Sequence, residues 1–381
     1  MSMKKIVLAI ILIALVGGAA YFGWRLFARN EGGGTTPPPL LPPSPPIPTG
    51  SSPDAMRALT PSAVFAYWVN GATETLYYVT EEGQIMRAVL GGETQAVTNQ
   101  RIDQLRSATP SPDGERVLVS FGAADRPFFS VFDIAESSWQ PLPEGVTAAA
   151  WSPDGARLAL LVHAGGEGTL NTFTLKDRTV KELVQLNIRG VELSWGAPDE
   201  LFILERPSAK HFGSLWRFTF SGTTLLPVVQ NQRGLMVRWW PGGATGIRFG
   251  YEENQLRLDT ITSHGASLGK LPLVTLPTKC AFGNTMMYCG VPRELSLRDE
   301  WPDDYFSRKR YTEDNLFSWS SSTNAFSRIW EGDGLDVQEP LVRGAKLFFL
   351  NRYDRRVYEF LLPAPEPVRT EEDRGGDGLA P

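Results

Sequence analysis

Residues 109–120 read TPSPDGERVLVS and residues 150–161 read AWSPDGARLALL, so the same pattern recurs after 41 residues. In both copies a Pro-Asp-Gly turn precedes an uninterrupted apolar run. Proline fixes φ, the aspartate can accept a hydrogen bond from the following backbone, and glycine can adopt a positive φ, so the tripeptide predicts a tight turn. The apolar run is typical of a strand that is buried on both faces.

Weaker copies of this unit extend in both directions along the chain. After Trp151, aromatic residues mark further copies at steps of 42 to 45 residues, namely Trp195, Trp240 and Phe282. A degenerate first copy begins at Val64, and a late last copy begins at Leu341. A step of about 40–45 residues is typical of one four-stranded blade of a β-propeller. The sequence therefore predicts an all-β propeller over residues 56–362.

Counting the copies gives seven blades, and six is the alternative count. The predicted blades are 61–99, 103–143, 146–185, 189–229, 233–273, 277–331 and 335–362. The last copy holds only three strand-like segments. We expect Met56–Thr60 to supply the fourth strand beside Arg356–Leu361, because closing the ring removes exposed sheet edges.

The motif in TPSPDGERVLVS and WSPDGARLALL resembles the repeat of TolB-type, WD40-like β-propellers. The resemblance covers roughly residues 56 to 362 and implies a fold, not an activity. TolB-type proteins carry an additional α/β domain before the propeller, whereas here an apolar segment and a short linker occupy that position. A role in the Tol-Pal system therefore does not follow.

The N-terminal 30 residues predict a membrane anchor. Lys4 and Lys5 precede an uncharged apolar run at residues 6–23, which as a helix of about 27 Å nearly spans a hydrocarbon core of about 30 Å. The basic residues before the run favour a cytoplasmic N-terminus, with the remainder of the chain on the periplasmic or extracellular side. The alternative is a cleaved signal peptide, since small residues occur at 17–20.

Two segments outside the repeats predict non-globular structure. Residues 31–55 are rich in glycine and proline, with nine prolines between positions 35 and 53, and predict a semi-rigid linker. Residues 363–381 are rich in proline, glycine and acidic side chains, and predict a disordered acidic tail.

Composition excludes several classes of protein. With 37 Lys and Arg against 42 Asp and Glu, the net charge of −5 argues against nucleic-acid binding. Two cysteines exclude a cysteine-ligated zinc site, and three histidines leave little material for histidine chemistry. His163 and His211 each follow the second strand of a blade and should share one rim, but two histidines make a poor metal site. We expect no metal and no cofactor.

The sequence also argues against a catalytic serine. Gly265-Ala-Ser267-Leu-Gly269 matches a nucleophile-elbow pattern by chance, since no histidine follows Ser267. We therefore expect no catalytic residue.

Cys280 and Cys289 predict a disulfide. They flank a short hairpin, in which opposed Cα atoms lie about 4.5–5.5 Å apart, within reach of a cross-link. An exported domain meets oxidising conditions. The alternative is a pair of buried free thiols.

One long insertion interrupts the regular spacing. Residues 290–315 read GVPRELSLRDEWPDDYFSRKRYTEDN and connect the second and third strands of blade 6. Aromatic residues and arginine are frequent at binding hot spots, and long loops on rigid scaffolds often carry function. The candidate binding residues are Trp301, Asp303, Asp304, Tyr305, Phe306, Arg308, Arg310 and Tyr311. Alternatively, the insertion covers the mouth of the central channel with its own aromatics.

The sequence favours a non-catalytic scaffold that binds an extracytoplasmic protein or a glycan. One alternative is a hydrolase or lyase that acts on polysaccharides with carboxylates of the insertion, namely Glu294, Asp299, Glu300, Asp303 and Asp304. The other alternative is a structural subunit of an envelope assembly.

Overall fold

The computed structural model describes residues 56–88 and 93–363. The predicted anchor at 6–23, the linker at 31–55 and the tail beyond residue 363 lie outside the described residues. None of the helices in the described ranges has the length and apolar character needed to cross a bilayer.

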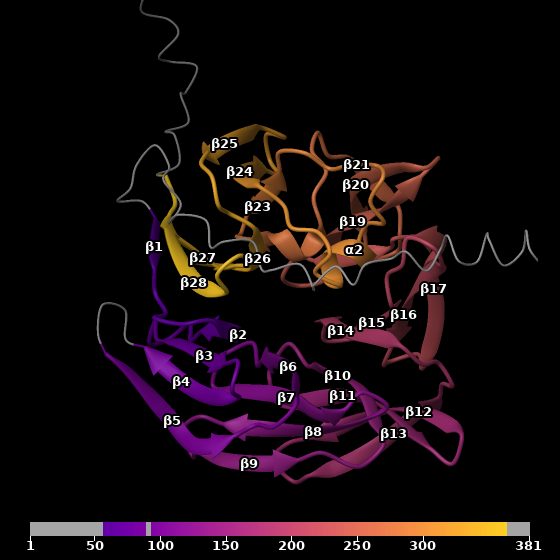
Figure 1. Ribbon diagram of the computed structural model, residues 1–381. Coiled ribbons are helices and arrows are strands. Elements are labelled where there is room, and N and C mark those ends of the chain that lie inside the picture. The colour runs from indigo at the N-terminus through magenta and orange to yellow at the C-terminus, as the bar shows by residue number, and fades with distance from the viewer. Residues whose placement is uncertain (1–55, 89–92, 364–381) are drawn as a thin grey trace, which may run out of the picture. The chain divides into compact units, whose positions relative to one another are not determined.

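The strands form seven antiparallel sheets of four, which are the blades of a propeller. The predicted count of seven is confirmed, and the alternative of six is wrong. In Figure 1 the colours pass once around the ring, from indigo in blade 1 to yellow in blade 7.

Blades 1 to 3 each run from an inner to an outer strand in chain order. Blade 1 consists of β2 (Val64–Val69), β3 (Leu76–Thr80), β4 (Gln84–Ala88) and β5 (Thr94–Arg101). Blade 2 consists of β6 (Leu105–Pro110), β7 (Arg116–Ala123), β8 (Arg126–Asp133) and β9 (Ser138–Pro141). Blade 3 consists of β10 (Val146–Trp151), β11 (Arg157–Ala164), β12 (Glu167–Thr174) and β13 (Thr179–Gln185).

Blades 4 to 6 follow the same order, and two short helices accompany blade 6. Blade 4 consists of β14 (Val191–Ala197), β15 (Glu200–Glu205), β16 (Phe212–Thr219) and β17 (Thr224–Arg233). Blade 5 consists of β18 (Met236–Trp239), β19 (Thr245–Glu252), β20 (Gln255–Thr262) and β21 (Ser267–Lys270). Blade 6 consists of β22 (Cys280–Phe282), β23 (Met286–Pro292), β24 (Asp314–Ser320) and β25 (Phe326–Trp330), with the helices η2 (Pro277–Lys279) and α2 (Asp303–Phe306).

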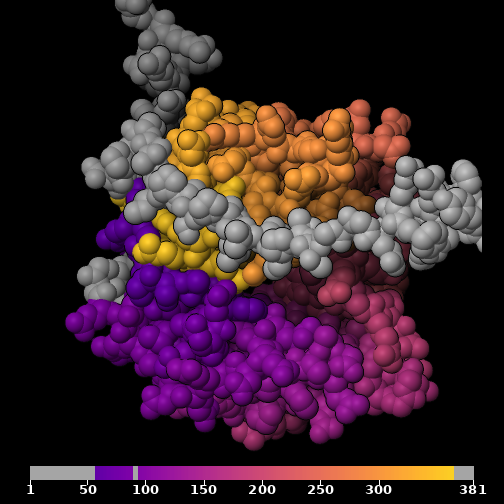
Figure 2. Space-filling view, viewed as in Figure 1, coloured from indigo at the N-terminus to yellow at the C-terminus, as the bar shows by residue number. Residues whose placement is uncertain are grey.

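Blade 7 closes the ring with a strand from the other end of the domain. It consists of β26 (Val337–Arg343), β27 (Lys346–Asn351), β28 (Arg356–Leu361) and β1 (Met56–Ala58). β1 pairs antiparallel with β28, placing Met56 opposite Phe360, and the Leu59 amide continues the ladder to the Val357 carbonyl at 2.7 Å. The predicted closure is confirmed. In Figure 2 the indigo atoms lie against the yellow atoms that end the described chain.

The Pro-Asp-Gly units behave as the sequence predicts. In blade 3, Gly155 has a φ of +68°, and Asp154 Oδ1 accepts a hydrogen bond from the Ala156 amide at 3.0 Å. Trp151 Nε1 donates to the Thr109 carbonyl of blade 2 at 3.0 Å, so this indole links neighbouring blades. Four consecutive apolar side chains of β11 are fully buried. The repeat therefore encodes both the turn and the contact between blades.

The predicted disulfide is present. Cys280 and Cys289 lie opposite each other in the β22–β23 register, with Cα atoms 4.1 Å apart. The bond joins the inner strand of blade 6 to the strand that leads into the insertion.

Two faces of the propeller are distinguished by their loops. The loops between second and third strands, and the connections between blades, share one face with segment 293–313, and we call it the insertion face. The other turns lie on the opposite face, where Met56 begins the described chain beside Phe360, and we call it the entry face. His163 and His211 both lie on the insertion-face side, which confirms their predicted common rim.

Candidate functional site

Segment 293–313, which we call the insertion, folds back onto the blades. Two of its aromatic side chains are buried, Trp301 at 2% exposure and Tyr305 at 1%. The Trp301 amide donates to the Tyr251 hydroxyl of blade 5 at 3.1 Å, and its indole donates to the Ser296 carbonyl at 2.9 Å. These two candidate binding residues therefore hold the insertion in place.

A buried ionic network lies next to Tyr305. Lys279 Nζ donates to Asp314 Oδ2 at 2.7 Å, to Asp336 Oδ1 at 2.5 Å and to Thr312 Oγ1 at 2.8 Å. Tyr305 Oη donates to the same Asp336 oxygen at 2.9 Å. The side chains of Lys279, Asp314 and Asp336 have no exposed surface. The network joins η2, the insertion, β24 and the connection into blade 7.

Burial and charge act in opposite directions within this network. Burial opposes the charge of Lys279, but Asp314 and Asp336 outweigh it and raise the pKa of Lys279 above its ordinary value. Burial raises the pKa of Tyr305 far above its ordinary value, although Lys279 opposes that shift. Burial, together with the charge of Asp336, raises the pKa of Asp314 to about 6 despite the nearby ammonium group.

Arg352 of blade 7 fixes the end of the insertion. Its guanidinium carbon lies 4.0 Å from the ring centre of Tyr305 and 4.5 Å from that of Tyr311. Nη1 of Arg352 also donates to the Arg310 carbonyl at 2.8 Å. Tyr311 in turn stacks on Tyr353, with ring centres 5.4 Å apart. Cation–π contacts of a partly desolvated arginine stabilise such an arrangement.

Most carboxylates of the insertion are engaged within the protein. Four of the five carboxylates that the sequence offers for catalysis have polar partners. Asp299 pairs with Arg310, and Glu300 pairs with Lys210. Asp303 accepts a hydrogen bond from the Ala209 amide, and Asp304 contacts both Lys309 and the Glu300 amide. The Glu300 amide and the Lys309 ammonium group hold the pKa of Asp304 below its usual range. The carboxylates act mainly as ties between the insertion and blade 4 or within the insertion.

Other side chains of the insertion point to solvent. Leu297 is 69% exposed and Phe306 is 46% exposed. Phe212 is 66% exposed, and it follows the blade 4 residues that contact the insertion. Arg308 is exposed as well, and no ion pair joins it to another side chain within the described ranges. Of the candidate binding residues, Phe306, Arg308 and Arg310 are thus accessible to a partner.

Polar side chains from three inner strands meet near the propeller axis. Tyr67 Oη of blade 1 donates to the Glu339 carbonyl of blade 7 at 2.6 Å. Arg238 of blade 5 donates to the Pro340 carbonyl at 3.4 Å and lies 3.6 Å from the Glu339 carboxylate. These contacts connect the inner strands of blades that are not all neighbours in the ring.

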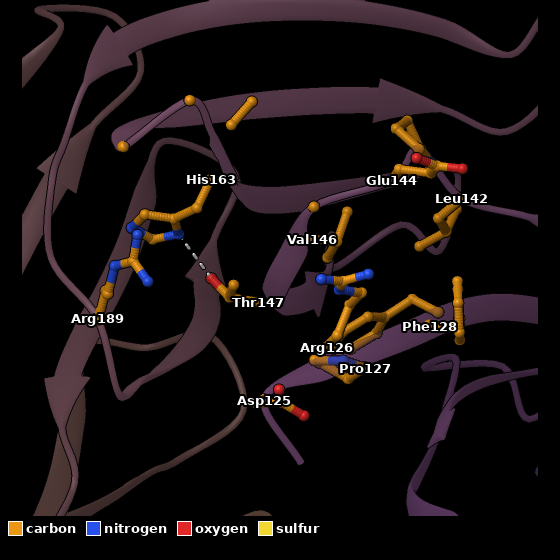
Figure 3. A pocket seen from close by; sticks show the side chains of 16 residues that line it. Asp125, Arg126, Pro127, Phe128, Leu142, Glu144, Val146, Thr147, His163 and Arg189 are labelled. Carbon is orange, nitrogen blue, oxygen red and sulfur yellow. Dashed lines mark hydrogen bonds between the residues drawn. The ribbon is translucent and has the colours of Figure 1, made fainter. Parts of the chain in front are cut away.

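A separate pocket of about 540 Å³ lies at the loops of blades 2 and 3 (Figure 3). None of the candidate binding residues lines it, whereas His163 does. Within residues 56–88 and 93–363, no group of three His, Cys, Asp or Glu side chains is arranged to hold a metal ion. Ser267 lies at the start of the outer strand β21, in agreement with a chance motif.

No protein-family model and no curated protein matches this chain. Solved structures do match. An oligogalacturonate lyase in complex with manganese has a TM-score of 0.58 and 13% identity, with 84% of this chain and 96% of that chain covered. The propeller domain of the Trilobed protease from Pyrococcus furiosus has a TM-score of 0.55 and 14% identity, with coverage of 78% and 95%.

TolB from Acinetobacter baumannii is also similar, with a TM-score of 0.45, 14% identity and 72% of this chain covered. The chain spans only 65% of that TolB and 34% of a tricorn protease. At such low identities the likenesses to the lyase and to the propeller domain of the Trilobed protease establish the fold alone. The chain is a seven-bladed β-propeller with a folded insertion on one face.

Proposed function

We propose that this protein is a membrane-anchored, extracytoplasmic scaffold that binds a protein partner on its insertion face. The anchor and the linker come from the sequence pattern at residues 6–23 and 31–55. The observation that carries the proposal is that the insertion is already folded. Some of its residues fix the loop to the blades, and others face solvent and are free to contact a partner.

A fixed loop is a favourable binding surface. Asp303 is tied to the Ala209 amide, Trp301 to Tyr251, and Arg352 stacks on Tyr305. Ordering a free loop on binding costs free energy, so a loop that is already ordered retains more of the interaction energy. A partner that binds here therefore meets a surface that needs little rearrangement.

The exposed groups have the composition of a protein-binding surface. Leu297 and Phe306 are large apolar side chains on the insertion, and Phe212 begins strand β16 of blade 4, next to the loop that contacts the insertion. Arg308 adds an exposed guanidinium group. Aromatic and arginine side chains that are surrounded by polar groups are enriched among the residues that dominate binding energy.

The described chain enters the propeller on the face opposite the insertion, so the start of the described chain does not cover the proposed binding surface. The described chain enters at Met56 on the entry face, and the insertion lies on the opposite face.

The second candidate function is an enzyme that acts on polysaccharides. The fold neighbour named as an oligogalacturonate lyase keeps this candidate open. Asp299 pairs with Arg310 inside the insertion, while Glu300 and Asp303 contact blade 4. These contacts favour binding over catalysis, since a glycosidase needs two free carboxyl groups that face each other across the substrate. Screening Asp303→Asn and Asp304→Asn variants against cell-wall glycans tests this candidate.

Co-purification from gently solubilised membranes tests the scaffold. A Leu297→Glu, Phe306→Glu variant should lose the partner, because charged groups replace the apolar contacts. A Leu268→Glu variant is the matched control, because Leu268 is 58% exposed on the outer strand β21, away from the insertion. The proposal fails if both variants retain every partner, or if both lose the same partners.

A further inference from the structure

We propose that the pocket over blades 2 and 3 binds a small organic monocarboxylate with an apolar body. The pocket has a volume of about 540 Å³, within the usual range of small-molecule sites. Its walls come from the loop between β7 and β8, the connection into blade 3, the loop between β11 and β12, and the connection into blade 4. It is separate from the insertion, so it does not depend on the scaffold function.

Two uncommitted guanidinium groups line the pocket. Arg126 and Arg189 make no side-chain hydrogen bond or ion pair with any residue in the described ranges, although most arginines of the propeller do. In Figure 3 the Arg126 guanidinium group lies in the middle of the lining side chains, and Arg189 lies beside His163. A guanidinium group presents paired donors that match the geometry of a carboxylate.

The same pocket exposes apolar surface next to Arg126. Phe128 is 52% exposed, although it is a large aromatic side chain, and the half-buried Pro127 lies next to it in the chain. Leu142 and Val146 also line the pocket, but they are buried and form its floor. In Figure 3, Phe128 and Val146 lie on either side of the Arg126 guanidinium group. An apolar wall around a few polar groups is the usual composition of a small-molecule site. The ligand thus needs an apolar part within reach of its anionic group.

Charge limits the ligand to a single carboxylate. Asp125 and Glu144 also line the pocket, and in Figure 3 their carboxylates lie at its margins, away from Arg126. They repel a second negative charge on the ligand. His163 shares a hydrogen bond with Thr147 at 3.0 Å, and burial together with Arg189 lowers the pKa of His163, so the imidazole adds no charge at neutral pH. The two arginines therefore supply the attraction.

Calorimetry with the full-length protein in lipid nanodiscs tests the assignment, with empty nanodiscs as the blank. The probes are 3-phenylpropanoate, its neutral analogue 3-phenylpropanamide, and glucuronate, which is a carboxylate without an apolar body. We expect 3-phenylpropanoate to bind at least about tenfold more tightly than either other probe. Only this probe has both a carboxylate for the arginines and an apolar body for the surface around Phe128.

Variants locate the binding in this pocket. Arg126→Gln should weaken 3-phenylpropanoate binding by about tenfold, and Arg189→Gln should weaken it to a smaller extent. Both arginines are exposed, so neither change should alter the melting temperature. The matched control is Arg178→Gln, an exposed arginine in the β12–β13 turn on the entry face. Equal binding of acid and amide, equal binding of glucuronate, or an Arg126→Gln variant that binds like the control overturns the proposal.

Discussion

At the scale of single residues, Lys279 is the group on which the insertion depends most. It is fully buried and pairs with two fully buried carboxylates, Asp314 and Asp336. Removal of one partner from a buried ionic network leaves uncompensated charge, which costs about 3–5 kcal/mol. We predict a loss of this size in the free energy of unfolding of a Lys279→Met variant, measured by urea denaturation.

The control for this prediction is a lysine in an exposed ion pair. Lys309 pairs with Asp304, and its side chain is 70% exposed. Exposed pairs contribute about 0–1 kcal/mol, so Lys309→Met should change the stability by less than about 1 kcal/mol. Equal effects of the two substitutions would show that the buried network does not stabilise the fold.

Asp314 gives a pH dependence with a definite sign. Its pKa in the folded protein is raised to about 6, whereas an unfolded aspartate titrates near 3.9. The folded state therefore holds this proton more tightly, and the resulting stabilisation is complete below pH 4 and is lost as the pH rises through about 6. The loss amounts to about 3 kcal/mol.

Urea denaturation between pH 4 and pH 7 checks this sign. The stability of the wild-type protein should fall with rising pH relative to that of an Asp314→Asn variant, in which position 314 cannot ionise. A difference between the two proteins that stays constant across this range, or that changes in the opposite direction, contradicts the assignment.

At the scale of elements, the insertion should be as rigid as its contacts imply. Trypsin cleaves after lysine and arginine, and the exposed run 308–310 offers three such positions. We predict slow cleavage there in the folded wild-type protein. Asp303→Ala removes the acceptor for the Ala209 amide and should accelerate cleavage at 308–310 several-fold, with little change in the melting temperature.

The proteolysis control is Asp333→Ala. Asp333 is 82% exposed and pairs with Arg293 at 2.8 Å, near the start of the insertion and away from the cleavage sites. Its loss should leave the cleavage rate at 308–310 unchanged. Rapid cleavage of the wild-type protein would mean that the insertion is not prefolded, and the proposed binding surface would lose its main support.

Local signals in the sequence sufficed to predict most elements. The turn and buried strand of blades 2 and 3 depend on neighbouring residues, such as Asp154 and Gly155, and so repeat visibly in the sequence. The disulfide followed from the register of one hairpin. The network around Lys279 was missed, because Asp314 and Asp336 lie 35 and 57 residues further along the chain and nothing local marks them as partners.

The candidate site was predicted only in part, for a related reason. Sequence composition identifies the insertion but does not distinguish Trp301 and Tyr305, which are buried, from Phe306, which is exposed. The pocket was missed as well. Arg126 begins β8 of blade 2 and Arg189 lies in the connection from blade 3 to blade 4, and only the packing of neighbouring blades brings them to one cavity.

At the scale of the whole molecule, closure by β1 should stabilise the ring. Met56 and Ala58 pack against the blade 7 core, and Thr60 Oγ1 accepts a hydrogen bond from the Val357 amide at 3.1 Å. Deletion of residues 56–60 from the full-length chain leaves β28 as an exposed edge, which promotes association. We predict a melting temperature several degrees lower and a shift to larger species in size-exclusion chromatography.

A deletion of five linker residues, 35–39, is the control for the length of the chain. It should change neither the melting temperature nor the elution volume. An intact melting temperature after deletion of 56–60 would mean that three strands suffice in blade 7.

Photo-cross-linking in living cells shows whether a protein partner lies on the insertion face. The photoreactive residue p-benzoylphenylalanine is placed at Phe306 and, in separate strains, at the exposed outer-strand positions Leu268 and Leu226. We predict one discrete protein adduct from position 306 and none from the other two. Adducts from the outer strands with none from position 306 would mean that the partner does not bind on the insertion face.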